Sequence, residues 1–162
     1  MRPKDFHHLS RKLSEAARDA SHAADRRAGH IRSIQAQIDA LTRGDVTGVL
    51  QHAHEDVSLE IFAPLQFSWV TRARGTDAVW RAIAHNFDSV DEQQPELLNI
   101  VSEGDVVVLI GRERGVIRAS GERYDVQFVQ RFTFRDGRLA AVQIIAANSD
   151  GAEAFGVDSG TR

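Results

Sequence analysis

The chain has 162 residues, a length that fits a single domain. It contains no cysteine, which excludes a disulfide framework, a thiolate zinc site and a cysteine nucleophile. The net charge of −3 provides no basic field, so we expect no nucleic-acid partner.

The charge is divided unevenly along the chain. Residues 1–30 carry a net charge of +3, residues 31–148 carry −4 and residues 149–162 carry −2. The first residues lead into no apolar segment typical of a signal peptide, and no stretch is apolar for the roughly 18–20 residues that a membrane span needs. We therefore expect a cytoplasmic protein that does not bind a membrane.

Residues 1–29 are expected to form a helical N-terminal extension. Over residues 4–27, apolar side chains recur at spacings of three and four and form a narrow, alanine-rich stripe. The stripe consists of Leu9, Leu13, Ala16, Ala17, Ala20, Ala23 and Ala24. Such a stripe suits packing on another surface better than filling a core. The extension is therefore either a solvated helix or an arm that packs on its own domain or on a second subunit.

A second helix is predicted over residues 28–43, because isoleucine and leucine recur there with the helical period. Gly44 ends this helix, and Asp45 is placed as the N-cap of a short helix that reaches about Ala53. Strands are predicted over residues 57–63 and 65–74. In the first of them Glu60 alternates with the apolar side chains, so we expect Glu60 to face outward.

The rest of the chain is rich in strands. A helix begins after Gly75 and is followed by a loop at residues 91–95. Strands are then predicted over residues 97–102, 106–118, 124–134 and 139–147, and residues 149–162 form a flexible C-terminal tail. Helices that are segregated from a mostly antiparallel sheet define the α+β class.

The strand over residues 124–134 carries the most informative pattern, because Gln130 interrupts a row of apolar and aromatic side chains. A buried amide needs hydrogen-bond partners, so Gln130 is either satisfied within the fold or faces a cavity and binds a ligand there. His85 lies beside the apolar stripe of its helix and is a candidate proton carrier. The run Arg112-Glu113-Arg114 is interpreted as a ladder of solvated or interface charges. No set of converging ligands is fixed by spacing, so we expect no metal and no cofactor.

Several segments resemble nuclear transport factor 2-like domains, and most closely the SnoaL-like, ketosteroid-isomerase-related proteins. These segments are residues 40–50, 55–60, 74–80, 103–108 and 132–139. The resemblance covers about residues 30–148 and implies a cone-shaped α+β roll of the cystatin-like type, in which a curved antiparallel sheet is wrapped by three helices. It also implies an apolar pocket inside the cone and a homodimer that forms through the outer face of the sheet.

The resemblance also locates the positions where ketosteroid isomerase carries its base and its two oxyanion donors. In this chain those positions hold Ile61, Gln37 and Gln130. Ile61 cannot abstract a proton, so isomerisation by that mechanism is not expected. SnoaL-like cyclases place an acidic residue at the end of the last strand, where Asn148 or Asp150 stands here.

The predicted function is binding of a small apolar or amphipathic organic molecule in this pocket, with weak metal-free acid/base activity as an extension. The expected apolar walls are Ile61, Trp69, Phe87, Tyr124 and Phe128, and the expected polar contacts are Gln37 and Gln130. One alternative is a polyketide-cyclase, dehydratase or isomerase-type enzyme that uses His85 or Asp150 as proton carrier. The other is an interaction module whose pocket is packed shut.

Overall fold

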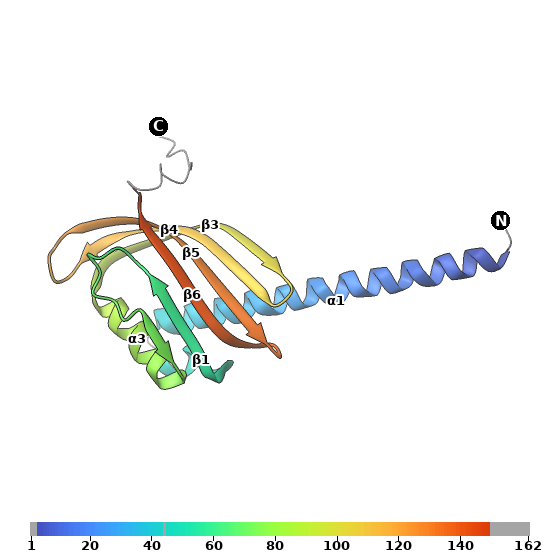
Figure 1. The fold of residues 1–162 in the computed structure, drawn as a ribbon, viewed down its shortest axis with the longest axis horizontal. Coiled ribbons are helices and arrows are strands. Elements are labelled where there is room, and N and C mark those ends of the chain that lie inside the picture. Colours follow the sequence, from blue (N-terminus) through green and yellow to red (C-terminus); the bar gives the residue numbers. More distant parts are fainter. Residues whose placement is uncertain (1–2, 44, 150–162) are drawn as a thin grey trace.

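Figure 1 shows a computed structural model of the chain, which describes residues 3–43 and 45–149. The elements are α1 (Pro3–Thr42), α2 (Val46–Val49), β1 (Ala53–Phe62), β2 (Arg72–Arg74), α3 (Thr76–Asp88), β3 (Val90–Glu103), β4 (Val106–Ile117), β5 (Arg123–Arg135) and β6 (Arg138–Asn148). The strands form one curved sheet that is combined with two long helices and the single turn α2. The predicted α+β class is confirmed. The C-terminal tail and Asp150 lie outside the described residues.

The sheet has the order β2-β1-β6-β5-β4-β3. Strands β3 to β6 form an antiparallel meander, as the turn signals predicted. In contrast, β1 runs parallel to β6, with Leu59 beside Val142 and Ile61 beside Ile144. The expectation of an antiparallel sheet is therefore wrong at this one pair, and the sheet is mixed. Parallel neighbours need a long connection, and here the chain passes through α3 and the first strands of the meander before it returns beside β1.

One face of the sheet, the inner face, packs against the helices. Ile34 of α1 and Val79 and Ala82 of α3 join side chains of β1, β4, β5 and β6 in a single buried cluster. The ring of His30 stacks on Phe134 with centroids 4.2 Å apart and an interplanar angle of 8°. These contacts fix the second half of α1 across the inner face.

The two helices predicted at the N-terminus are one continuous helix of 40 residues, which corrects the expected break near residue 28. No proline interrupts this stretch, and a lone glycine such as Gly29 costs a helix only about 1 kcal/mol. The predicted domain boundary after residue 29 lies where the described side chains change from exposed, at residues 21–27, to buried at His30. The turns before this boundary project beyond the sheet in Figure 1.

Two strand boundaries also differ from the prediction. Only residues 72–74 of the expected strand 65–74 pair with β1, because the preceding residues form a loop whose aromatic side chains turn inward. Asn86 of α3 fixes that loop, since its side chain accepts from the backbone N–H of Val70 and donates to the backbone oxygen of the same residue. The expected loop at 91–95 is instead the beginning of β3. Pro95 is tolerated there because β3 is an edge strand, where a missing N–H need not break a ladder.

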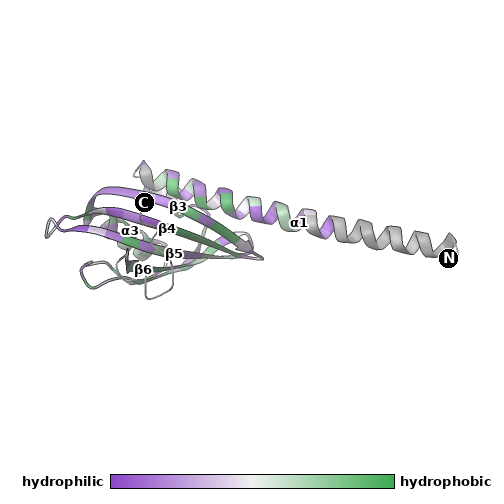
Figure 2. Cartoon of the chain, turned by 90° about the horizontal axis from the view of Figure 1, so that it is seen from above, coloured by the Kyte–Doolittle hydropathy of each residue, from purple (hydrophilic) through white to green (hydrophobic). Residues whose placement is uncertain are grey.

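The polar and apolar parts of the meander are separated along its length. Figure 2 shows β3 and β4 changing from hydrophilic at one end to hydrophobic at the other. The hydrophilic end, which we call the polar end of the sheet, is where β3 and β5 begin and where β4 and β6 end. Among the described residues, no helix is long and apolar enough to cross a membrane.

Candidate functional site

A pocket of about 430 Å³ opens at the polar end of the sheet. Its lining comes from the loop before β2, from β3, β4, β5 and β6, and from the turn between β4 and β5. The lining residues are Gln66, Glu92, Gln94, Arg114, Gly115, Glu122, Arg123, Tyr124, Asp125 and Asn148. Most of these side chains are polar or charged, and Tyr124 supplies the aromatic surface.

Tyr124 is buried at the inner edge of this pocket, and its hydroxyl donates to Glu113 Oε1 at 2.6 Å. Strand alternation explains the pairing, because it places Gly111, Glu113 and Gly115 on the inner face of β4, and Tyr124 of β5 lies opposite Gly115. Gln93 Nε2 also donates to Glu113 Oε1, at 3.4 Å. Burial first, and then the hydrogen bond to the Glu113 carboxylate, raises the pKa of Tyr124 above its usual value. The phenol therefore stays protonated under ordinary conditions.

The two glycines of β4 provide room for aromatic rings that lie across the strand. A Cβ atom at Gly111 would meet Phe128 Cζ, and one at Gly115 would meet the Tyr124 hydroxyl oxygen at 2.6 Å. Both hypothetical atoms would also press on the backbone of β3. Glycine at these two positions therefore lets the rings of β5 lie on β4, on either side of Glu113.

Tyr124 also belongs to a small aromatic cluster. Its ring meets Phe67 edge-on with centroids 5.1 Å apart, and Phe67 stacks on Trp69 at 4.3 Å. Trp69 Nε1 donates to Ser89 Oγ at 3.0 Å. The loop before β2 thus covers the inner face beside the pocket with aromatic side chains.

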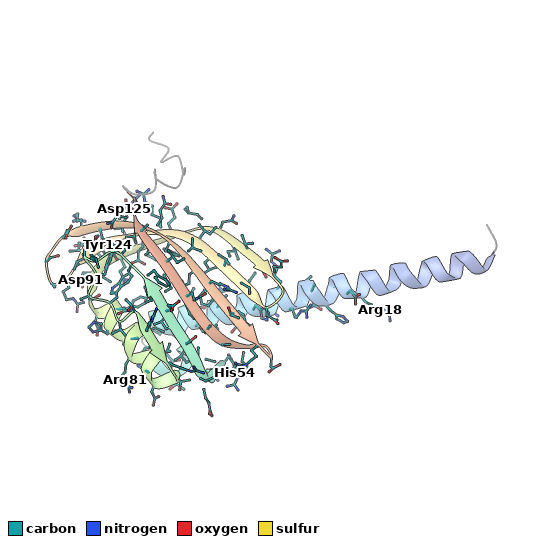
Figure 3. All side chains as sticks on the ribbon, viewed as in Figure 1. Arg18, His54, Arg81, Asp91, Tyr124 and Asp125 are labelled. Carbon is teal, nitrogen blue, oxygen red and sulfur yellow. The ribbon has the colours of Figure 1, made fainter. Side chains whose placement is uncertain are left out.

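The outer rim of the pocket is held by ion pairs. Arg112 and Arg114 both bind Asp125, and Ser149 Oγ donates to the same carboxylate at 2.8 Å. The hydrogen bond from Arg112, supported by Ser149 and Arg114, lowers the pKa of Asp125 to about 2. Arg123 lies 3.5 Å from Glu92. Figure 3 shows Tyr124, Asp125 and Asp91 gathered at this end, with His54 at the opposite end.

The expected apolar contacts are distributed over the inner face rather than around this pocket. Tyr124 lines the pocket, whereas Ile61 is buried in the central core and Trp69 is half-buried beside it. Phe128 is half-buried and lies opposite Gly111. Phe87 is 45% exposed on α3. The role of these residues as ligand contacts stays a prediction.

The expected polar contacts lie on two different elements. Gln130 is half-buried on the inner face of β5, and its side chain makes no hydrogen bond with a described residue. Gln37 is half-buried on α1, where its Nε2 donates to Ser33 Oγ at 3.5 Å. The candidate proton carrier His85 is exposed, and its Nε2 lies 3.1 Å from the backbone oxygen of Ser68. Asn148 pairs its amide reciprocally with that of Gln66 at the pocket wall.

Glu113 is the residue that sequence reasoning missed. Its neighbours Arg112 and Arg114 form the outer charge ladder that was predicted, but Glu113 points to the inner face. The signal was present in the alternation of β4, because Glu113 shares its phase with Val107 and Leu109 rather than with the arginines. Within the described part of the chain, no group of three or more His, Cys, Asp or Glu residues could hold a metal ion.

The fold recurs in solved structures of low sequence identity. A nuclear transport factor 2-like protein of unknown function from Burkholderia pseudomallei is 21% identical with a TM-score of 0.60, over 81% of this chain and 98% of its own. A protein named as an isomerase from Rhodopseudomonas palustris is 18% identical with a TM-score of 0.61, over 78% of this chain and 96% of its own. TerC, which was co-crystallised with polyporic acid, is 20% identical with a TM-score of 0.59, over 78% and 96% of the two chains.

The family is shown by the sequence itself. No curated protein matches the chain. The profile of the SnoaL-like domain family, however, matches residues 34–142. This stretch includes α3, β1 to β5, the inner-face residues Glu113 and Tyr124 and most of the pocket lining. The chain therefore belongs to the SnoaL-like domain family.

Proposed function

We propose that the chain binds a small organic molecule at the polar end of the sheet, with the molecule reaching from the pocket onto the inner face. The observation that carries this proposal is the pocket of about 430 Å³ beside the buried Tyr124. Ligand sites occupy about 300–1,000 Å³, and this pocket joins a mostly polar lining to the aromatic side chain of Tyr124. The fold shared with TerC, which was co-crystallised with polyporic acid, supports a ligand of this kind.

The expected inner-face contacts extend the same proposal. Gln130 has donor and acceptor groups without a described hydrogen-bond partner, and the other inner-face side chains of β5 are apolar or aromatic. An amide in such a position can orient a ligand, because it both donates and accepts. Phe128 and Ile61 would then contact the apolar part of the molecule.

The test begins with the full-length protein as purified. Small molecules released by denaturation are identified by mass spectrometry, and a metabolite panel is screened for compounds that raise the melting temperature. A ligand at 100 times its dissociation constant should stabilise the fold by about 2.7 kcal/mol. Absence of any retained compound, together with no stabilising compound in the panel, would contradict the proposal.

A matched pair of variants then locates the ligand. Gln130→Leu should weaken binding of the identified compound, because it removes both polar contacts from the inner face. Gln127→Leu makes the same change on the outer face of the same strand and should leave binding unchanged. Equal affinities for the two variants would remove Gln130 from the site.

Enzymatic turnover is the second candidate function, and the hydrogen bond between Tyr124 and Glu113 is the observation that favours it. A carboxylate that is hydrogen-bonded to a phenol can accept a proton from a ligand while the phenol holds its position. His85 and Asp150 remain the proton carriers predicted from sequence. The two candidates are separated by Glu113→Gln and His85→Gln. If turnover of the identified compound survives Glu113→Gln but not His85→Gln, the proton carrier is His85 of α3 rather than Glu113 of β4.

A further inference from the structure

The first turns of α1, residues 3–29, form an arm that extends beyond the sheet (Figure 1). Among the described side chains of the arm, residues 18–19 and 21–27 are exposed, and His30 is the first that is buried. Helices in proteins owe most of their stability to the packing of an amphipathic face rather than to intrinsic propensity. The arm is therefore expected to pack on a surface outside its own helix.

The sequence of the arm is basic at its beginning. The first 14 residues of the chain include four Lys or Arg against a single Asp, whereas residues 15–29 carry equal numbers of both signs. Phe6, Leu9 and Leu13 recur at spacings of three and four, which is the period of an apolar face on a helix. The sequence therefore predicts an apolar strip accompanied by positive charge.

Strand β3 exposes a surface of the opposite charge. It is an edge strand, and its 14 residues include four Asp or Glu and no Lys, Arg or His. Leu97, Leu98 and Val101 are 52%, 55% and 49% exposed, and Leu98 lies at a shift in the register with β4. Proteins commonly cover an apolar edge of this kind with a helix or a loop, because it otherwise promotes aggregation.

Two carboxylates flank the apolar part of this edge. Glu96 precedes Leu97, and Glu103 ends the strand. Neither carboxylate forms an ion pair within residues 3–43 and 45–149, and the Arg112 guanidinium opposite Glu96 binds Asp125 instead. A basic helix with an apolar face matches this edge in both charge and hydrophobicity.

The arm cannot reach β3 of its own chain. Helix α1 passes the turn between β3 and β4 at His30, whose Nε2 lies 3.9 Å from Asp105 Oδ1. From this turn β3 runs back towards the polar end of the sheet, whereas the arm continues away from the sheet (Figures 1 and 2). Because α1 is one continuous helix, the arm does not fold back.

We propose that the arm packs on the edge strand β3 of a second copy of this chain. Its apolar strip covers Leu97, Leu98 and Val101, and its Lys and Arg side chains lie beside Glu96 and Glu103. Each copy supplies one arm and one edge, so two copies form two identical contacts about a two-fold axis. Direct pairing of two β3 strands is disfavoured, because it would bring like charges together.

The contact can be tested by crosslinking, because the chain has no cysteine and introduced thiols are unambiguous. Full-length Leu9→Cys, labelled with heavy nitrogen, and unlabelled Leu98→Cys are mixed at micromolar concentration, left to exchange subunits and treated with bismaleimidoethane. Crosslinked pairs are identified by mass spectrometry. We expect at least about tenfold more crosslink than between Leu9→Cys and Arg72→Cys, because docking raises the effective concentration of the two thiols. Arg72 is the matched control, since it is exposed on β2 at the other edge of the sheet.

Charge reversal tests the electrostatic part of the contact. Arg11→Glu with Lys12→Glu in the arm, or Glu96→Lys with Glu103→Lys on β3, should each lower the crosslink yield about fivefold, and the two reversals together should restore it. Glu55→Lys, at an exposed position of β1, is the control and should leave the yield unchanged. The arm variant lies outside the sheet and keeps the test informative if the β3 variant does not fold.

The outcomes decide whether the arm docks on β3. Recovery of the crosslink when both reversals are combined would support the contact, as would a yield that falls with added salt. Equal crosslinking of Leu9→Cys with Leu98→Cys and with Arg72→Cys, or a yield that neither reversal changes, would overturn the proposal. Crosslinks confined to pairs of Leu9→Cys chains would also overturn it, because the arms would then pack on each other.

Discussion

The hydroxyl of Tyr124 and the carboxylate of Glu113 form a hydrogen bond of 2.6 Å between β5 and β4, at the edge of the pocket. Tyr124 is only 4% exposed, so this contact links the buried aromatic cluster to the polar end of the sheet. The two residues stand at the boundary where β4 changes from apolar to charged. Their pairing is a property of the strand register, since Tyr124 lies opposite Gly115, two positions from Glu113.

The ionisation of Tyr124 can be observed directly, because the chain contains a single tyrosine. Burial and the Glu113 carboxylate raise the pKa of Tyr124 above the ordinary value of 10.0. Since the folded pKa lies above the unfolded one, the stabilisation is complete below about pH 10 and is lost as the pH rises beyond it. We expect tyrosinate absorbance to appear only together with unfolding, as followed by circular dichroism.

Glu113→Gln provides the comparison for this titration. It removes the negative charge beside the phenol and should lower the pH at which Tyr124 ionises. Tyrosinate absorbance at the ordinary pH in a chain that is still folded would show that the Tyr124 hydroxyl is not buried against a carboxylate.

The inner-face glycines of β4 should be intolerant of alanine. A Cβ at Gly111 would lie under 3.0 Å from the ring of Phe128, and one at Gly115 would lie under 3.0 Å from the Tyr124 hydroxyl. Each would also lie under 3.0 Å from a backbone oxygen of β3. Overpacking of this kind costs about 1–3 kcal/mol, and we expect Gly111→Ala and Gly115→Ala each to lose that much free energy of unfolding in urea denaturation.

Gly29→Ala is the matched control for the two glycines. Its added Cβ would have ordinary contact with Arg32 at 3.9 Å, and alanine is favoured over glycine by about 1 kcal/mol within a helix. The control should therefore be neutral or stabilising. Equal stability of all three variants would mean that the rings of Phe128 and Tyr124 do not lie across β4.

The rim of the pocket should weaken in acid. Arg112 lowers the pKa of Asp125 to about 2 from an ordinary value of 3.8. Because the folded pKa is depressed, the stabilisation is present above about pH 4 and is lost as the pH falls towards 2. Asp125→Asn should cost about 1 kcal/mol at neutral pH, since both partners are partly exposed.

The loss of free energy of unfolding in Asp125→Asn should shrink as the pH falls, because the unmodified chain then loses the charge of the Asp125 carboxylate as well. The free energy of unfolding of both chains is compared across the acid range. Asp39→Asn, which removes an exposed carboxylate from α1, should change little at any pH. A difference between Asp125→Asn and the unmodified chain that grows towards acid would contradict the assignment.

Local signals in the sequence predicted most of the meander. The turns at Gly104 and Gly137 have positive φ angles of 55° and 73°, which glycine adopts without strain. The alternation of residues 124–134 assigned the inner face of β5 correctly from Tyr124 to Phe134. Turns and strand alternation depend on residues that are close together in the sequence, and the local sequence pattern therefore predicts them.

The features that were not predicted depend on distant segments. The parallel pairing of β1 with β6 joins Ile61 to Ile144, and no local pattern encodes that choice. The role of Glu113 required the register between β4 and β5, which brings it within reach of Tyr124. The loop before β2 was mistaken for a strand because its aromatic residues alternate as strand residues do, while Asn86 of α3 fixes it in another conformation.

The outer face of the sheet has an apolar row that fits the predicted homodimer. The register places Phe62, Ile145 and Val129 side by side on β1, β6 and β5, and Ile110 continues the row on β4. Phe62 is 51% exposed, Ile145 is 57% exposed and Val129 is 39% exposed. Neighbouring apolar side chains on one face are typical of surfaces that associate. We expect Gln127, Val129 and Arg131 to lie in this contact.

Light scattering should therefore detect a dimer at micromolar concentration. Ile145→Lys places a charge at the centre of the row and should weaken the dimer by about 2 kcal/mol, or roughly thirtyfold, because association would then bury less apolar area and an unpaired charge. Leu65→Lys is the control, since Leu65 is fully exposed in the loop before β2 and does not belong to the row. A monomer at micromolar concentration, or equal dissociation constants for the two variants, would show that the dimer does not form through this face. A shift confined to Ile145→Lys would place the contact on the outer face of the sheet.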